Sequence, residues 1–226
     1  MSLNKSKGNM YEFVTHTWNT VKGACPHGCT YCYMKRWGKQ KPVRMDEKEL
    51  RTDLGSGNFI FVGSSCDMFA EEIPAEWIEK TLEHCKKHDN SYLFQSKNPV
   101  RIFEYRKLLP VNSVVCTTIE SDIIPDGITN WRCPGISGRV GAMAALHTMG
   151  MQTYVTIEPV MDFDTEKLLQ LIEMCHPEQV NIGADSGNNH LPEPSAEKLR
   201  DLITGLKEFT TIHNKSNLGR LQPRRV

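Results

Sequence analysis

Six short apolar runs, each followed by a segment with helical periodicity, limit what this chain can fold into. The runs are YEFVTH from Tyr11, NFIFVG from Asn58, SYLFQ from Ser91, NSVVCTTI from Asn112, QTYVTI from Gln152 and QVNIG from Gln179. The last five are mostly continuous rather than alternating, which is typical of parallel strands covered on both faces. Alternating strands and helices favour a parallel sheet with right-handed crossovers, either an open sheet or a partial barrel.

The predicted helices begin at residues that commonly cap or open a helix. These residues are Pro74, Asn98, Ser137, Asp164 and Ser195. Pro110 and Gly150 end two of the helices, since neither residue favours continuing one. We therefore expect the order of one strand and one helix to occur six times.

Length and charge restrict the class of protein further. The chain has 226 residues, with 27 Lys and Arg against 27 Asp and Glu. We expect one domain over residues 1–226, with flexible ends at 1–10 and 214–226. The charge balance predicts no global attraction to nucleic acid or membranes, although a local basic patch is compatible with it. The absence of a bilayer-length apolar run or a signal core predicts a cytoplasmic protein without a membrane partner.

Polar side chains follow the predicted strands at their carboxyl ends. They are Ser64, Ser65, Asp67, Ser96, Lys97, Glu120, Ser121, Glu158, Asp185 and Ser186. Open α/β sheets and barrels both bind ligands at this end of the strands. The sequence therefore predicts the site there, and the Glu158 carboxylate is a candidate for orienting a ligand or substrate, with a structural ion pair as the alternative.

The cysteines form the most specific motif. Eight cysteines without a secretion signal indicate free thiols rather than a disulfide framework. Cys25, Cys29 and Cys32 form a C-x3-C-x2-C pattern directly after the first predicted strand. Structural zinc sites usually have four ligands in two pairs, and no second pair is present. Three cysteines on an iron–sulfur cluster leave one iron open, so the spacing favours a cluster over zinc or redox thiols.

The loop resembles the signature of the radical S-adenosylmethionine (SAM) superfamily, C-x3-C-x-aromatic-C, in which Tyr31 is the aromatic residue. Within the superfamily the chain is similar to spore photoproduct lyase-like and phage-associated uncharacterised proteins. The segments that carry this likeness are Thr17-Trp18-Asn19, Gln95-Ser96-Lys97, Gly138-Arg139-Val140, Ile157-Glu158-Pro159-Val160 and Gly183-Ala184-Asp185-Ser186. The resemblance implies an α/β fold, a partial (β/α)6 TIM-like barrel of the radical SAM type.

The resemblance also implies cofactors and site residues. Cys25, Cys29 and Cys32 would ligate a 4Fe-4S cluster, whose open iron would bind SAM for reductive cleavage to a 5'-deoxyadenosyl radical. The other SAM contacts implied are Tyr31 near the adenine, Lys97 and Arg139 at the carboxylate, and Thr118 and Glu120 at the ribose. The family's Gly-Gly-Glu element falls at Gly63, Ser64 and Ser65, where the expected carboxylate is missing. Cys66 and Cys133 are candidate hydrogen-atom donors, with ordinary loop thiols as the alternative.

The expected partners are an electron donor such as flavodoxin or ferredoxin and a substrate that is nucleic acid or a partner protein. Two other classes stay open. A non-enzymatic iron–sulfur electron carrier would hold a cluster without cleaving SAM, and a zinc-dependent binding module would be colourless.

Overall fold

One curved sheet organises the computed structural model, which describes residues 3–8, 10–129 and 133–222. The strands of this sheet, in spatial order, are β1 (Asn4–Lys5), β2 (His16–Trp18), β5 (Phe59–Val62), β6 (Ser91–Gln95), β7 (Ser113–Thr118), β8 (Gln152–Ile157), β9 (Gln179–Ile182) and β10 (Thr211–Asn214). All neighbours pair in parallel except β1 and β2. The order ends at β1 and β10 without closing, which confirms the predicted partial barrel.

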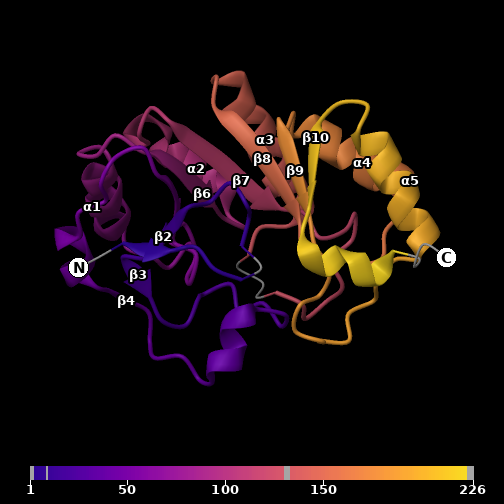
Figure 1. Ribbon diagram of the computed structural model, residues 1–226, viewed down its shortest axis with the longest axis horizontal. Helices are drawn as coiled ribbons and strands as arrows, with labels where there is room; N and C mark the ends of the chain where they lie inside the picture. The colour runs from indigo at the N-terminus through magenta and orange to yellow at the C-terminus, as the bar shows by residue number, and fades with distance from the viewer. Residues whose placement is uncertain (1–2, 9, 130–132, 223–226) are drawn as a thin grey trace.

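Five α-helices lie one after another along the outer side of the curve (Figure 1). They are α1 (Ala75–Cys85), α2 (Pro99–Tyr105), α3 (Ile136–Thr148), α4 (Thr165–Met174) and α5 (Ala196–Leu206). Asn98, Asp164 and Ser195 accept hydrogen bonds from first-turn amides, so these predicted caps are confirmed. The predicted cap at Ser137 is wrong: α3 begins at Ile136 after Gly135, whose carbonyl accepts the Arg139 amide.

The first strand–helix unit differs from the prediction. A short antiparallel pair, β3 (Val21–Lys22) and β4 (Arg44–Met45), follows β2. The helices of this unit are 3-10 helices, η1 (Tyr33–Trp37) and η2 (Glu47–Arg51). The other 3-10 helices are η3 (Arg106–Leu108) and η4 (Ser216–Leu221). The expected strand–helix order is therefore confirmed for β5 to β9. The first unit instead consists mainly of a long loop with short strands and 3-10 helices.

The predicted first strand was placed too early in the chain. Residues 11–13 form a turn, and pairing with β5 begins only at His16. The turn exists because the Tyr11 ring is buried on the inner face of the sheet, where its hydroxyl donates to Gln95 Oε1 at 2.9 Å and bonds Thr156 Oγ1 at 2.7 Å. A buried tyrosine hydroxyl needs such partners, which a continuous strand along β5 would not supply.

Apolar side chains divide between the two faces of the sheet. The larger core lies between the outer face and the α-helices, and it includes Cys85 and Cys175, as the sequence predicted. The smaller core fills the inner face with Tyr11, Val14, Phe61, Leu93, Val114 and Cys116. The segment around Tyr11 therefore lies inside the curve, so the open interior is at the carboxyl ends of the strands.

The ends of the chain contain secondary structure within the described residues. β1 lies on the edge of the sheet beside β2, and η4 buries Leu218 against the larger core. The missed strand β10 is short and largely exposed, which weakened its apolar pattern in the sequence. The single domain and the flexible ends remain predictions. No helix among the described residues combines the length and apolar character that a membrane span requires.

Candidate active site at the carboxyl ends of the strands

The cysteine loop is held at its base by β3 and β4. Ala24 N donates to Lys41 O at 2.8 Å, beside the last pair of that small sheet. Gly23 has φ +113°, and a Cβ on it would lie 2.6 Å from Pro42 O, so only glycine fits this close approach. Residues 25–32 then form successive turns, in which Gly28 N donates to Cys25 O and Cys32 N to Cys29 O.

The three thiols on this loop are neighbours. A hydrogen bond with Cys66 and burial raise the pKa of the Cys25 thiol. Burial raises the pKa of Cys29 to about 12 and also raises that of Cys32, and charge on Cys25 adds to both effects. Each thiol therefore needs a bound cation to become a ligand. No described group of three His, Cys, Asp or Glu residues converges as a site for a metal ion.

The donor chemistry nevertheless suits the implied cluster. Cys25, Cys29 and Cys32 are on one loop, and thiolates are the usual ligands of iron–sulfur clusters. Lys97 lowers the pKa of Cys29 and of Cys32 against the effect of burial, so positive charge already lies near these sulfurs. The donor types and the nearby positive charge are therefore compatible with a 4Fe-4S cluster, and the three cysteines as its ligands stay a prediction.

The fully buried carboxylate of Glu120 accepts hydrogen bonds from three of the residues that were predicted to contact SAM. Lys97 Nζ donates to Glu120 Oε1 at 2.8 Å, and Arg139 Nη1 donates to Glu120 Oε2 at 2.9 Å. The Tyr31 hydroxyl also donates to Oε1, and Lys97 Nζ lies 5.2 Å from the centre of the Tyr31 ring. The structure thus brings together residues of the cysteine loop, β6, β7 and α3 that are far apart in sequence.

Charge pairing dominates the electrostatics around Glu120. Burial alone would raise the pKa of Glu120, but Lys97 and Arg139 lower it to about 2. Burial alone would lower the pKa of both cations, yet the Glu120 carboxylate raises each above its usual value. All three groups are therefore charged at neutral pH, because each one makes the charge of the others favourable.

Arg139 is almost saturated by further hydrogen bonds. Its Nε donates to Pro134 O at 2.8 Å, Nη1 donates to Thr118 O at 2.8 Å, and Nη2 lies 3.2 Å from Cys133 Sγ. The predicted residues Thr118 and Cys133 are therefore beside Arg139. Thr118 is buried and its hydroxyl accepts a long hydrogen bond from Gln95.

His27 and Asp67 join the cysteine loop to the sheet. His27 Nε2 and Asp67 Oδ2 are 2.9 Å apart, and the same oxygen accepts Ser96 Oγ at 2.8 Å and Lys97 N at 2.9 Å. Against the effect of burial, Asp67 raises the pKa of His27 to about 10. The buried pair therefore ties the loop to the ends of β5 and β6.

The two candidate hydrogen-atom donors have different surroundings. Cys66 is 2% exposed and hydrogen-bonds the Cys25 thiol. Cys133 is also buried, and its sulfur interacts with His27 and Arg139. Burial by itself would raise the pKa of Cys133, but the hydrogen bond with His27 and the nearby positive charges lower it. Sequence alone did not separate these two thiols.

The Gly63, Ser64 and Ser65 segment faces Asn19 and η1. Ser64 Oγ and Ser65 N both donate to Asn19 Oδ1, at 3.2 and 2.9 Å, and the Tyr33 hydroxyl donates to Ser64 O at 2.8 Å. Gly63 has φ +82°, which allows the sharp turn after β5. These contacts hold the segment against Asn19 and η1, and its role at the amino group of SAM stays a prediction.

Glu158 follows β8 directly, at the strand end next to that of Glu120. Lys215 Nζ donates to Glu158 Oε2 at 2.7 Å, and Lys215 Nζ lies 4.6 Å from the centre of the Tyr11 ring. A Cβ on Gly183 would come within 2.8 Å of the Glu158 side chain, so the glycine makes room for the carboxylate. Sequence reasoning missed Tyr11 and Lys215, because neither follows one of the predicted strands.

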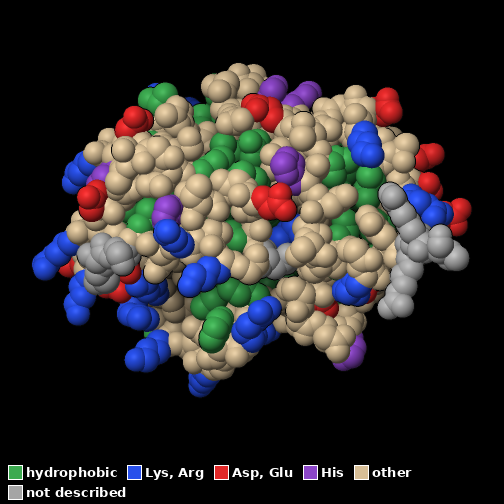
Figure 2. All heavy atoms as spheres, viewed as in Figure 1, with side chains coloured by type: hydrophobic (Ala, Val, Ile, Leu, Met, Phe, Trp, Pro, Cys, Tyr) green, Lys and Arg blue, Asp and Glu red, His purple; other side chains and the backbone are tan. Residues whose placement is uncertain are grey.

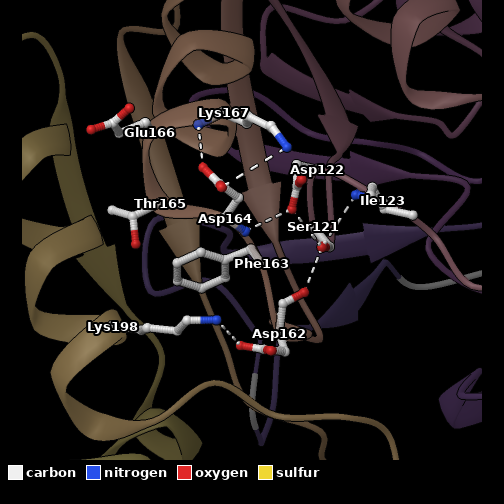
Figure 3. Close-up of a pocket in the computed structure, with 10 residues that line it drawn as sticks. All are labelled: Ser121, Asp122, Ile123, Asp162, Phe163, Asp164, Thr165, Glu166, Lys167 and Lys198. Atoms are coloured by element: carbon white, nitrogen blue, oxygen red, sulfur yellow. Dashed lines mark hydrogen bonds and ion pairs between the residues drawn. The ribbon is translucent and has the colours of Figure 1, made fainter.

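A cavity of about 620 Å³ opens between the loops after β7 and β8 (Figure 3). Its acidic lining residues are Asp122, Asp162, Asp164 and Glu166. Lys198 pairs with Asp162 at 2.8 Å, and Lys167 lies 3.9 Å from Asp164. None of the residues predicted to hold the cluster or SAM lines this cavity, although Ser121 follows Glu120 directly.

Comparison with known proteins supports the fold. No protein-family model and no curated protein sequence match the chain. A solved structure of spore photoproduct lyase with bound AdoMet and dinucleoside spore photoproduct is similar, with a TM-score of 0.68, 9% identity, and coverage of 93% of this chain and 80% of the other. A second structure, of spore photoproduct lyase complexed with the dinucleoside spore photoproduct, has a TM-score of 0.69 and 10% identity. The match covers 94% of this chain and 79% of the other.

A more distant likeness is to SuiB of Streptococcus suis, with a TM-score of 0.56 and 10% identity. It covers 88% of this chain and 49% of SuiB. Together these structures confirm the predicted architecture, an α/β partial barrel like that of spore photoproduct lyase.

Proposed function

We propose that this chain is a radical SAM enzyme acting on a nucleic-acid-related substrate. The observation that carries the proposal is the meeting of the three-cysteine loop with the buried group of Lys97, Glu120, Arg139 and Tyr31. The similar fold of spore photoproduct lyase, seen with AdoMet and with a dinucleoside, supports both the cofactor and the substrate class.

The residues of the chain divide the tasks of binding. Cys25, Cys29 and Cys32 would hold the 4Fe-4S cluster, which supplies the electron that cleaves SAM and so begins radical chemistry. Among the described contacts, Lys97 uses one of its three N–H donors, on Glu120, whereas Arg139 is nearly saturated. Lys97 is therefore the better partner for the SAM carboxylate, and Arg139 fixes Glu120.

Other residues shape and close the site. Tyr31 presents its ring beside Lys97 while its hydroxyl is held by Glu120, so the ring is oriented for the adenine. Thr118 and Glu120 are our proposed ribose contacts, and Gly63, Ser64 and Ser65 our proposed contacts for the SAM amino group. Glu158, at the neighbouring end of β8, would orient SAM or substrate. Buried walls of this kind exclude water, which protects a reactive radical from side reactions.

Cys66 is the preferred hydrogen-atom donor. Its thiol bonds another thiol, whereas Cys133 Sγ interacts with an arginine and a histidine that favour the thiolate. A hydrogen-atom donor requires an S–H bond, and the surroundings of Cys133 favour the loss of its proton, so we prefer Cys66. Replacing Cys66 with alanine, but not Cys133, should change the products of the radical without preventing SAM cleavage.

The direct test is anaerobic reconstitution with iron and sulfide, followed by dithionite and SAM. We expect a brown protein that forms 5'-deoxyadenosine. An assembled cluster without this product would leave the electron-carrier alternative, and a colourless zinc protein would leave the binding module.

Two matched cysteine variants sharpen the test. Cys29→Ala should abolish both the cluster absorbance and turnover, because it removes one of three ligands. Cys85→Ala should lower only stability, by about 1 kcal/mol, because Cys85 is a buried apolar contact of α1 in the larger core. Retention of the cluster in Cys29→Ala would contradict the ligand assignment.

A further inference from the structure

Two pairs of histidine rings are in contact in the described part of the chain, and they differ in what their nitrogens bond. The ring centres of His84 and His88 are 4.9 Å apart, and those of His147 and His176 are 4.7 Å apart. In the first pair, His84 Nε2 bonds Thr52 O at 2.8 Å, and His88 Nδ1 bonds His84 O at 3.1 Å. The first pair therefore has a structural role.

The second pair has ring nitrogens that the protein does not use. In the part of the chain that the structure describes, no hydrogen bond or ion pair reaches the rings of His147 and His176, and both residues are exposed. Neutral imidazole nitrogens are the commonest metal ligands in proteins. Two such rings in contact on the surface are therefore candidates for a metal site.

The backbone holds these two histidines at the ends of neighbouring helices. His147 is in the last turn of α3, and Gly150 N donates to His147 O at 2.8 Å. His176 follows α4, where its amide donates to Glu173 O at 2.9 Å and its carbonyl accepts Thr153 Oγ1 at 2.9 Å. Since α3 and α4 pack against each other, the backbone fixes the pair while the rings stay accessible.

The pair lies away from the candidate active site. β8 begins at Gln152, after α3, and β9 begins at Gln179, after α4, so the helix ends are at the amino ends of the strands. Figure 2 shows two histidine side chains next to each other at the upper edge of the molecule, where Figure 1 draws α3 and α4. A ligand bound there is independent of the proposed function.

The electrostatics at the pair favour a cation. The carboxyl-terminal ends of α3 and α4 meet there, and each helix dipole places partial negative charge at that end. Residues 140–166 and 168–197 contain no Lys or Arg, and the charged residues closest to His176 in the sequence are Glu173 and Glu178. A positive ion is therefore attracted to the two rings.

The available donors favour an ion that needs few ligands. Among the described residues, no group of three His, Cys, Asp or Glu converges on a metal site, whereas structural zinc takes four ligands. Cu⁺ accepts two or three ligands, and it combines imidazole nitrogen with thioether sulfur. Met149 and Met174 are 58% and 56% exposed, and each is two residues from one of the histidines.

We propose that His147 and His176 bind one Cu⁺ ion, to which Met149 and Met174 supply thioether sulfur. Two nitrogens bound to one first-row metal ion at about 2.0 Å each are about 4 Å apart. Rings with centres 4.7 Å apart reach this separation when they turn about their exposed side-chain bonds. The ion keeps its oxidation state, and it links the end of α3 to the end of α4.

The test titrates the 226-residue chain with Cu⁺ under argon against bicinchoninate, a competing chelator. Cysteine thiols also bind Cu⁺, so the measurement is the difference between variants rather than total uptake. His147→Gln/His176→Gln removes the pair. The control His190→Gln/His213→Gln removes two exposed histidines that belong to neither pair. NMR spectra of the labelled imidazole nitrogens report which histidines the ion reaches.

We expect the unmodified chain and the control to bind one more Cu⁺ ion than His147→Gln/His176→Gln at the same chelator concentration. The imidazole signals of His147 and His176 should shift, and those of the structural pair should not. Met149→Leu/Met174→Leu should weaken Cu⁺ binding at the pair severalfold, because leucine keeps the apolar bulk but removes the sulfur.

Three results would overturn the inference. Equal Cu⁺ uptake by the unmodified chain and by His147→Gln/His176→Gln would show that the pair binds no ion. Zn²⁺ that shifts the same two imidazole signals at a lower concentration than Cu⁺ would refute the choice of metal. Unchanged affinity in Met149→Leu/Met174→Leu would refute the thioether ligands. None of these measurements requires SAM or its cleavage, so they are separate from a failure of the proposed function.

Discussion

Two ion pairs lie at the carboxyl ends of the neighbouring strands β7 and β8, and they differ in how completely the protein encloses them. The Glu120 side chain is 0% exposed and both of its oxygens have cationic partners, Lys97 and Arg139. The Glu158 side chain is 18% exposed, and its partner Lys215 is 10% exposed. Glu120 follows β7 and Glu158 follows β8, so the two carboxylates lie at neighbouring strand ends. Tyr31 of the cysteine loop contacts the first group, whereas Lys215 pairs with the second carboxylate.

The difference in burial indicates that the charges around Glu120 are fixed in place, whereas those of the Glu158–Lys215 pair can rearrange. Removing one member from a fully buried group leaves an uncompensated charge in a low-dielectric interior. A partly exposed pair is screened by water, so it can exchange partners at low cost. We infer that the Glu120 group forms a rigid wall of the interior, and that the Glu158 pair forms an adjustable one.

The largest expected effect is that of Glu120→Gln. The substitution keeps the shape of the side chain but leaves the Lys97 and Arg139 charges without their counterion. We expect the free energy of unfolding to fall by about 3–5 kcal/mol. Urea denaturation followed by circular dichroism measures it. A loss below about 1 kcal/mol would show that water reaches these cations and would erase the contrast with Glu158.

The next largest effect is expected from acid, which should lower stability through Glu120. The pKa of Glu120 is about 2 in the folded chain, below the usual value of about 4.3 for glutamate. A carboxyl group with a lowered folded pKa contributes stability that is complete above its unfolded pKa and is lost as pH falls toward 2. The contribution is on the order of 3 kcal/mol.

The matched measurement is the free energy of unfolding of the unmodified chain and of Glu120→Gln between pH 6 and pH 3, values chosen to span the usual range of glutamate titration. The unmodified chain should lose stability more steeply, because it alone contains this carboxylate. Parallel curves for the two proteins would contradict the assignment of a lowered pKa to Glu120.

A smaller effect is expected from Tyr11→Phe, which tests how the adaptable wall is supported. The ring and its packing remain, but Gln95 Oε1 and Thr156 Oγ1 lose a hydrogen-bond partner. Two weakened buried polar groups cost about 1–2 kcal/mol. Thermal unfolding should show the loss, and Glu12→Gln, an exposed change in the same turn, should not.

The smallest effect on stability is expected from Glu158→Gln. The amide can still accept a hydrogen bond from Lys215, and the site is partly exposed, so stability should change by less than about 1 kcal/mol. If Glu158 orients SAM or substrate, formation of 5'-deoxyadenosine should nevertheless fall severalfold. A variant that is destabilised as much as Glu120→Gln would show that this wall is as rigid as the other.

Much of the architecture could be predicted because its signals are local. Continuous apolar runs and helix caps such as Asn98 and Asp164 act over a few residues, and they placed β5 to β9 and most helices correctly. The proximity of Lys97 and Glu120 also followed from position, since parallel strands bring their carboxyl ends to one edge. Arg139, on α3, was named only through the family resemblance. The chemical roles of these residues and of the cysteines remain predictions.

The errors arise where distant contacts decide the local structure. The run at Tyr11 has strand-like residues, but hydrogen bonds to β6 and β8 hold it in a turn inside the curve. Lys215 follows a strand too short and too exposed to show a pattern. The contact of 2.9 Å between His27 and Asp67 could not be predicted either, because the two residues are far apart in the sequence.

The unclosed sheet has a consequence for behaviour at high concentration. Its two outermost strands leave backbone N–H and C=O groups that a second chain could extend, the usual beginning of edge-to-edge aggregation. Both strands are short, and both carry polar residues, with Asn4 and Lys5 on one edge and Thr211, His213 and Asn214 on the other. Such blunt, hydrophilic borders discourage strand addition, so the chain keeps an accessible interior without becoming a template for its own polymer.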